Sequence, residues 1–235
     1  MQVTPLGDST LVLTLGDSID EDTLTRVQSA CAALEAAALP AVTELVPAYT
    51  TVTLFYDPAA AAAAGAPARD IAGWLGVRVL QAAERAVSRP PALPGRVIEI
   101  PICYEREYAP DLAEVAERTG LAAAEIVRLH LAAEYLVYLV GFAPGFPYMG
   151  GLPAQLAIPR RPVPRKRVPP GSVGIIGAQC GIYPIETPAG WNLIGRTPRP
   201  LFRPAHEPPV LLQAGDRVRF RRISAAEFEE WEETA

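Results

Sequence analysis

The chain has 235 residues, half of them hydrophobic and a fifth charged, and its net charge is -5 at pH 7. This length suits one large domain or two domains of about 100–150 residues each. The negative charge gives no general reason to expect nucleic acid as a partner. Because the first fifteen residues lack a basic start followed by an apolar run, no export signal is expected, and we predict a cytoplasmic protein.

Cysteine and histidine usage argues against a metal site. Cys31, Cys103 and Cys180 are scattered without a CxxC pair, and only two histidines are present. We interpret the cysteines as buried free thiols in a reducing compartment. A nucleophilic Cys180 would need a base, and no histidine lies near it in the sequence. We expect His130 to pack on a helix face.

The first 88 residues predict a small α+β domain. Strand-like alternation and helical spacing of apolar residues predict six elements. In chain order these are two strands within residues 3–15, a helix over 20–39, two strands within 42–56 and, after a low-complexity connector over 57–68, a helix over 69–87. The order ββαββα indicates a two-layer domain over 1–88. A proline-rich linker over 89–95 follows.

Residues 96–235 form the second predicted domain. A strand over 96–102 and two short helices over 110–118 and 122–134 come first. Between 141 and 204, Gly and Pro make up about a third of the positions, and short strands such as 173–176 and 182–185 alternate with turns. Many short strands between turns favour a closed barrel or a sandwich.

The run YLVGFAPGFPYMGGLP, residues 138–153, is uncharged and aromatic. Its glycines and prolines exclude a long helix, including one that spans a membrane, so no membrane partner is expected. The surrounding segment 141–204 carries a charge of +7, a local field that would attract anions. An apolar loop beside it is costly on a free surface, so we expect 142–152 to lie at a boundary with a partner subunit.

Six stretches of the chain carry a family resemblance. The longest are GFAPGFPYMGGLP, PRRPVPRKRVPPGSVGIIG and QCGIYPIETPAGWNLIGRTP, and PLGDSTLVLTLGD, VPAYTTVTLFYDP and ICYEREYAPDL precede them. They resemble the family called KipI, 5-oxoprolinase B subunit or allophanate hydrolase subunit 1. The resemblance covers essentially the whole chain. It implies a two-domain α+β protein, with the ββαββα domain followed by a cyclophilin-like β-barrel over 96–235.

The resemblance also implies a function. It points to the B subunit of an ATP-dependent 5-oxoprolinase, an enzyme that opens 5-oxoproline to glutamate. The B subunit is then inactive alone and works with two partners: the C subunit, which is a homologous barrel protein, and the A subunit. ATP is then a cosubstrate of the complex, and the substrate is a small lactam or amide. Two alternatives stay open: a protein inhibitor of a histidine kinase, and a subunit of a urea carboxylase or allophanate hydrolase type of enzyme. Two departures, Cys180 for the usual Thr and Ala189 for a Gly, are expected inside the site.

ATP-dependent opening of a lactam needs cations and hydrogen-bond donors around a phosphoryl group. We predict catalytic roles for Arg165, Arg196 and Gln179. The predicted substrate-binding residues are Arg160, Phe146, Tyr148, Gly171, Ser172, Tyr183 and Trp191. An arginine can bind the substrate carboxylate through two parallel hydrogen bonds, and the aromatic side chains would pack against the apolar ring of the substrate. Motifs for a P-loop, a dinucleotide fold and a serine nucleophile elbow are missing from the sequence.

Overall fold

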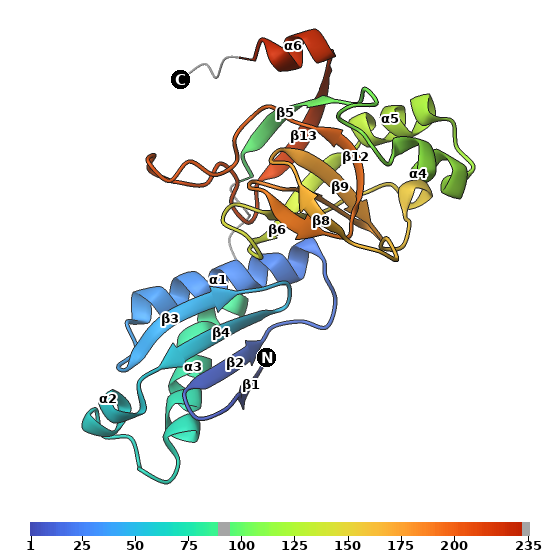
Figure 1. Cartoon of the computed structure of the whole chain (residues 1–235). Helices are drawn as coiled ribbons and strands as arrows, with labels where there is room; N and C mark the ends of the chain where they lie inside the picture. The colour runs from blue at the N-terminus through green and yellow to red at the C-terminus, as the bar shows by residue number, and fades with distance from the viewer. Residues whose placement is uncertain (89–94, 232–235) are drawn as a thin grey trace. The chain divides into compact units, whose positions relative to one another are not determined.

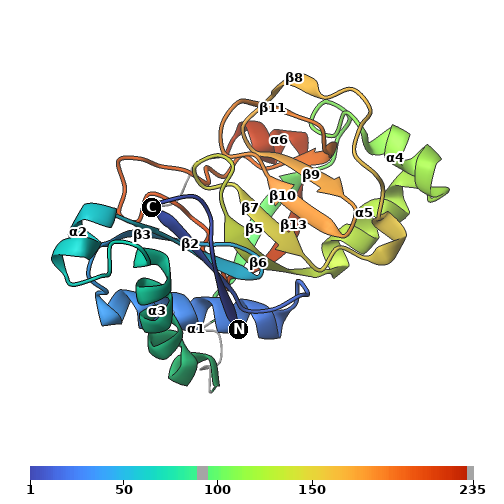
Figure 2. The same cartoon turned by 90° about the horizontal axis from the view of Figure 1, so that it is seen from below.

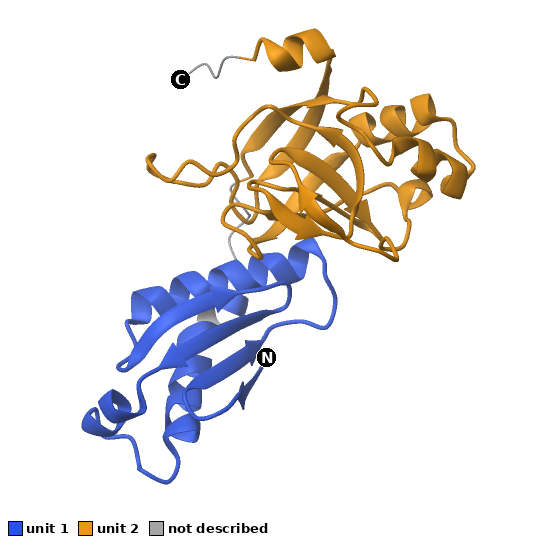
Figure 3. Ribbon diagram, in the orientation of Figure 1, with its two compact units in different colours: residues 1–93 blue, residues 94–235 orange. Residues whose placement is uncertain are grey.

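The computed structural model describes residues 1–88 and 95–231 (Figure 1). The chain divides into two compact units, residues 1–93 and 94–235 (Figure 3). The predicted linker over 89–95 lies outside the described residues except for Gly95. Each unit has its own hydrophobic core, and no helix in the described part of the chain is long and apolar enough to cross a bilayer.

The first unit is an antiparallel sheet with strand order β1-β2-β4-β3, and α1 and α3 cover one of its faces (Figure 1). Its elements are β1 (Gln2–Pro5), β2 (Thr10–Thr14), α1 (Glu21–Ala37), β3 (Val42–Pro47), β4 (Thr51–Tyr56), α2 (Pro58–Ala63) and α3 (Ile71–Ser88). The core contains Leu13 and Leu54 of the sheet together with Val27 and Val79 of the helices. The predicted strands and both long helices are confirmed.

The low-complexity connector predicted over 57–68 contains a short helix, α2, which the sequence analysis did not predict. The side chain of Asp57 accepts the N–H groups of Ala59 and Ala60 at 2.8 and 3.2 Å, and Pro58 occupies the first turn. An Asp cap, an early proline and a run of alanines are together a helix-start signal. The low complexity of the segment obscured that signal.

Seven strands of the second unit close into a barrel in the order β10-β7-β6-β13-β5-β12-β9 (Figures 1 and 2). Its elements are β5 (Val97–Cys103), α4 (Leu112–Thr119), α5 (Ala123–Ala132), β6 (Glu134–Val140), β7 (Pro147–Gly150), the 3-10 turn η1 (Ala154–Leu156), β8 (Arg165–Val168), β9 (Ser172–Ile176), β10 (Gln179–Ile182), β11 (Thr187–Ala189), β12 (Asn192–Arg196), β13 (Arg217–Ile223) and α6 (Ala225–Glu229). The barrel is confirmed, and its cyclophilin-like character stays a prediction. The strand predicted over 182–185 lies earlier, at β10.

The uncharged aromatic run splits into two antiparallel strands, β6 and β7, joined by a tight loop. Val137 and Met149 enter the barrel core, and Phe146 is buried in a second cluster. In the loop between these strands, Phe142 is 66% exposed to solvent, and its backbone φ is positive, at 70°. The chain thus buries part of residues 142–152 in its own cores and leaves Phe142, Pro144 and Gly151 exposed, and the boundary with a partner subunit stays a prediction.

Candidate functional site

Four aromatic side chains gather on the outer surface of the barrel wall. We call Phe146, Tyr148, Tyr183 and Trp191 the aromatic cluster. The ring centroid of Phe146 lies 4.8 Å from that of Tyr148, 5.0 Å from Tyr183 and 5.6 Å from Trp191, each in an edge-to-face arrangement. Such pairs are favoured over face-to-face stacking. The structure thus brings together all four aromatic residues that the sequence analysis assigned to the site.

Two glycines of the barrel wall make room for these rings. Side chains alternate across the wall, so Cys180 and Ile182 enter the barrel core while Gly181 between them faces outward. A Cβ on Gly181 would lie 2.6 Å from Cζ of Phe146 and 3.0 Å from Cζ3 of Trp191. A Cβ on Gly174 would lie 3.0 Å from Cβ of Trp191. The rings therefore rest directly on the backbone of β9 and β10, which explains why glycine and aromatic residues are interleaved here.

A two-stranded sheet formed by β8 and β11 lies beside the barrel (Figure 2). Val168 of β8 and Ala189 of β11 are buried against the aromatic cluster. Ala189 thus lies at the predicted site as expected. Cys180, the other departure from the family pattern, lies inside the barrel and not in the site.

Arg160 lies at the edge of the aromatic cluster. A Cβ on Gly190 would lie 2.6 Å from Nε of Arg160, so the arginine side chain packs directly over this glycine. Burial raises the pKa of Tyr148 and Tyr183, and the nearby charge of Arg160 partly opposes that rise. Both phenols therefore stay protonated at neutral pH and can donate hydrogen bonds.

The guanidinium of Arg160 is available for a ligand. Arg160 is exposed. Within residues 1–88 and 95–231 it forms no hydrogen bond or ion pair with another residue. A guanidinium beside two neutral phenols and an apolar wall is suited to bind a small anion that carries an apolar ring, such as a cyclic carboxylate.

Arg165, a predicted catalytic residue, binds a carboxylate of the chain itself. Its Nη1 and Nη2 donate to the two oxygens of Asp111 at 2.7 and 2.6 Å. Asp111 precedes α4 and is only 2% exposed. The sequence analysis missed Asp111, which it placed inside the helix predicted over 110–118, whereas the helix begins at Leu112. Arg165 is therefore occupied by this ion pair in the isolated chain.

Arg196, the second predicted catalytic arginine, has different neighbours from Arg160. Its Nε donates to the carbonyl of Pro170 at 2.8 Å, and its Cζ lies 5.6 Å from the ring centroid of Phe228 in α6. The three predicted arginines therefore do not converge on one shared partner. Of the three, Arg160 is the one that lies at the aromatic cluster.

Gly171 and Ser172 adjoin the cluster through their backbone. The N–H of Gly171 donates to the carbonyl of Tyr183 at 2.7 Å, and the carbonyl of Gly171 accepts from Thr197 at 2.9 Å. A Cβ at Gly171, where φ is +81°, would lie 2.0 Å from the Thr197 carbonyl oxygen. The close contact between the backbones at Gly171 and Thr197, which requires a glycine, is thus part of the fold. The N–H of Gly171 is therefore already used within the chain, and the substrate-binding roles of Gly171 and Ser172 stay predictions.

Gln179 begins β10 on the same outer face as Gly181, two residues away. That separation is about 7 Å along a strand, so Gln179 lies at the margin of the aromatic cluster. A side chain from this position reaches the cluster only from its edge. Its predicted role stays a prediction.

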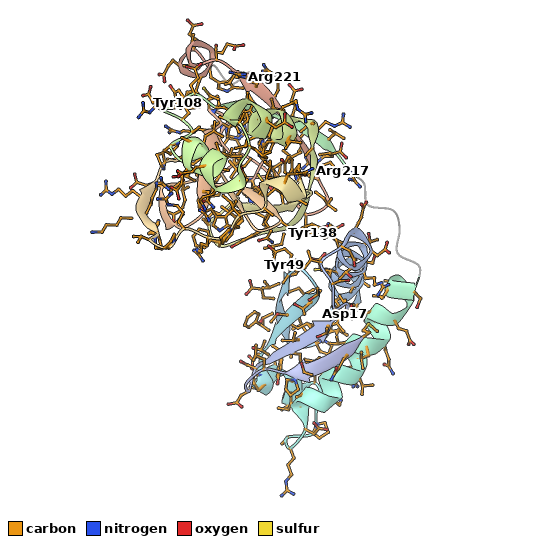
Figure 4. All side chains as sticks on the ribbon, turned by 90° about the vertical axis from the view of Figure 1, so that its right-hand side faces the viewer. Asp17, Tyr49, Tyr108, Tyr138, Arg217 and Arg221 are labelled. Atoms are coloured by element: carbon orange, nitrogen blue, oxygen red, sulfur yellow. The ribbon has the colours of Figure 1, made fainter. Side chains whose placement is uncertain are left out.

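Part of the positive charge expected over 141–204 is neutralised by acidic residues outside that segment. Arg161 pairs with Asp111 and Glu114, each at 2.7 Å. On β13, which lies outside that segment, Arg217 and Arg221 (both labelled in Figure 4) pair with Glu134 and Glu99. Counting charges along one stretch of sequence missed these partners from other elements, and Arg160 remains as the exception at the cluster.

A second polar group lies inside the barrel. Nδ1 of His130 lies 2.7 Å from the hydroxyl of Tyr104, and its Nε2 lies 3.5 Å from Sγ of Cys180. His130 and Cys180 have no solvent exposure. Burial lowers the pKa of His130 to about 3 and raises the pKa of the Cys180 thiol well above its ordinary value. The pair is therefore a neutral, sealed packing group.

The described residues contain no group of three or more His, Cys, Asp or Glu side chains that could hold a metal ion. Two surface hollows lie away from the aromatic cluster. One, of about 420 Å³, is lined mainly by β5 with Arg199, Arg221 and Trp231, and the other, of about 360 Å³, lies between α1 and β3 in the first unit. Neither hollow contains a predicted site residue.

Comparison with known proteins places this chain in a family. Residues 1–212 match the family model described as "Carboxyltransferase domain, subdomain C and D". The B subunit of 5-oxoprolinase from Bacillus subtilis (strain 168) is 42% identical over 99% of this chain and 97% of its own length. The chain belongs to this family. The resemblance predicted from the sequence motifs is confirmed.

Solved structures extend the comparison to the fold. The crystal structure of TTHA0988 has a TM-score of 0.74 and 37% identity over 91% of this chain, and the chain spans only 40% of the length of TTHA0988. The K. lactis urea amidolyase has a TM-score of 0.74 at 17% identity, over 97% of this chain and 15% of that one. At that identity the likeness concerns the fold alone.

Proposed function

We propose that this chain is the B subunit of an ATP-dependent 5-oxoprolinase and that it opens 5-oxoproline to glutamate only together with partner subunits. The observation that carries the proposal is the 42% identity, over almost the full length of both chains, to the B subunit from Bacillus subtilis. The aromatic cluster with Arg160 supports it, because 5-oxoproline is a small ring that carries one carboxylate.

In the proposed site, Arg160 binds the substrate carboxylate through two parallel hydrogen bonds. Charge-assisted bonds of this kind are about twice as strong as neutral ones. The lactam ring lies against Tyr148 and Trp191, and the protonated phenols of Tyr148 and Tyr183 donate to an anionic oxygen. Gln179 at the margin of the cluster contributes an amide.

The reaction needs ATP because amide resonance makes the lactam carbonyl a poor electrophile. Transfer of the γ-phosphoryl group to the lactam oxygen releases ADP and activates the ring carbon. One water adds to that carbon and the C–N bond breaks, giving an amine and an acyl phosphate. A second water then releases phosphate and glutamate. Positioned donors and cations stabilise the charge in such steps.

We place the remaining machinery on other polypeptides of the complex, namely the homologous barrel of the C subunit, together with the A subunit. Within the described residues no metal-binding group is found, and the sequence lacks a P-loop. Phe142, which has a positive φ and lies beside the cluster, is a large hydrophobic residue of the predicted boundary that the chain leaves exposed. We propose that the complex works in the cytoplasm.

The test is reconstitution. We expect the co-expressed subunits to form glutamate from 5-oxoproline with ATP hydrolysis, and the isolated chain to form none. Arg160→Gln should lower kcat/KM by about a hundredfold without dissociating the complex, since a charge-assisted pair is lost. Arg165→Ala should lower kcat/KM by about tenfold, because it removes one of the two guanidinium groups that the buried Asp111 binds. Arg167→Gln, at an exposed ion pair, is the control and should change kcat/KM by less than about twofold.

Unchanged kcat/KM in Arg160→Gln would reject the assigned role of Arg160. The kinase-inhibitor and carboxylase alternatives stay predictions. A pull-down with a purified histidine kinase core tests the first, and a urea carboxylation assay on the reconstituted complex tests the second. Binding or carboxylation in the absence of any 5-oxoproline turnover would replace the proposal.

A further inference from the structure

Asp111 ties three separate parts of the barrel unit together. Its carboxylate accepts from Nη1 of Arg161 at 2.7 Å, from both Nη atoms of Arg165, and from the backbone N–H of Leu193 at 2.7 Å. Its own N–H donates to the carbonyl of Leu193 at 3.0 Å. A carboxylate that is 2% exposed is stable as an anion only with such a set of donors.

The three groups that Asp111 binds frame the candidate site. Arg161 and Arg165 are the two ends of the loop that directly follows Arg160, and Leu193 lies two residues after Trp191 on β12. The N–H of Arg161 also donates to the carbonyl of Gly190 at 2.9 Å. Arg160 itself has no bond of its own in the described chain, so its direction is set by the residues on either side of it.

We propose that Asp111 is a positioning residue for ligand binding: by holding Arg161 and Arg165 against β12, it fixes Arg160 over the aromatic cluster. The inference rests on the proposed role of Arg160. Because the Asp111 bonds hold the backbone on the C-terminal side of Arg160 in place, that segment loses less conformational entropy when Arg160 binds a ligand. Asp111 does not touch the ligand, so its effect must pass through Arg160.

A double-mutant cycle on the reconstituted complex tests this. Asp111→Asn keeps the size of the side chain and can still accept from Leu193, but it lacks the charge that holds the arginines. We expect KM for 5-oxoproline to rise about tenfold in Asp111→Asn and about a hundredfold in Arg160→Gln, while the double variant stays within about twofold of Arg160→Gln, because residues in one network are not additive. If the effects of Asp111→Asn and Arg160→Gln on KM multiply in the double variant, the two residues act independently and the inference is wrong.

Asp216 is a matched control within the same unit. It is also buried, and it binds Nε and Nη2 of Arg96 at 2.9 and 2.5 Å and the N–H of Gln213 at 2.8 Å. Asp216→Asn removes a similar buried ion pair away from the cluster. It should lower the melting temperature as Asp111→Asn does, but leave KM within about twofold and multiply with Arg160→Gln. If Asp111→Asn and Asp216→Asn change KM equally, Asp111 only stabilises the fold and the inference is wrong.

Limited trypsin digestion of the full chain gives a readout that does not need turnover. Trypsin can cut between Arg160 and Arg161 but not between Arg161 and Pro162. We expect cleavage after Arg160 to be about tenfold faster in Asp111→Asn and unchanged in Asp216→Asn, because cleavage follows local opening. An unchanged rate overturns the inference. If cleavage is faster in Asp111→Asn but Arg160→Gln leaves KM unchanged, the proposed role of Arg160 is wrong.

Arg165→Gln serves where Asp111→Asn does not fold. It removes one of the two guanidinium groups from Asp111 and leaves Arg161 in place. Faster cleavage after Arg160 and a KM effect that disappears in the Arg160→Gln background support the inference. A normal cleavage rate overturns it.

Discussion

The two faces of strand β10 carry groups of similar chemical type, but the inner group is buried and the outer group is accessible to solvent. Inside the barrel, Cys180 lies beside His130 and Tyr104, a set that would suit nucleophilic catalysis in an open cleft. Outside, one residue further along, Gly181 supports the aromatic cluster and leads to Arg160. The inner group is sealed and neutral, whereas the outer group reaches solvent with a charge that the described chain leaves unpaired.

This difference shows that access, rather than the types of residue, separates a site from a packing group. Burial depresses the pKa of His130 and raises that of Cys180, so neither group carries the charge that a catalytic pair needs. The outer phenols are also kept neutral, but as neutral donors beside a cation they remain useful for binding an anion.

The largest expected effect concerns the inner face at low pH. The pKa of His130 is about 3 in the folded chain and about 6.5 when unfolded. The unfolded chain therefore binds the extra proton first, so stability is fully present above pH 6.5 and is lost as pH falls toward 3. Between pH 7 and pH 4 the wild type should lose about 3 kcal/mol of unfolding free energy more than His130→Gln.

Urea unfolding across that pH range measures the difference. His206→Gln, at the exposed second histidine, is the control and should follow the wild type. NMR offers a check that needs no variant at the buried position: the His130 ring signal should not titrate between pH 8 and 5. A titration midpoint near 6.5 for that signal would mean that the inner face is open to water.

The next effect concerns the outer face. Gly181→Ala adds a methyl group that would lie 2.6 Å from the ring of Phe146. Because two packed rings must move, we expect a loss of about 1–3 kcal/mol in unfolding free energy. Gly76→Ala in α3 is the matched control, since its Cβ would lie 3.4 Å from Val3 and alanine favours a helix. If both variants were equally stable, the cluster would not rest on the strand as described.

The smallest expected effect separates the two faces in function. Cys180→Ala should keep turnover of the reconstituted complex within about twofold and cost about 1–2 kcal/mol of stability through the lost contact with His130. The native thiol of Cys180 should resist alkylation until the chain unfolds, as judged by mass spectrometry. A tenfold loss of turnover in Cys180→Ala would show that the inner face takes part in the chemistry.

Much of the fold could be predicted from the sequence. Strand alternation, helical spacing and turn residues are local signals, and they predicted the strands and long helices of the first unit. For the second unit they left a barrel or a sandwich open, and the family resemblance implied the barrel. The miss at α2 came from treating an alanine run as featureless, although Asp57 and Pro58 mark its start. The strand predicted over 182–185 was displaced because apolar runs do not define their own ends.

The sequence by itself determined the family and predicted the four aromatic residues of the candidate site, because motifs and residue types can be read from single positions. Only the tertiary structure decided which cation stays available. Asp111 neutralises Arg161 and Arg165 from a different element, while Arg160 is left beside Tyr148 and Tyr183. Electrostatic partners are set by distance in space, and residues fifty positions apart in the chain meet only once the barrel has closed.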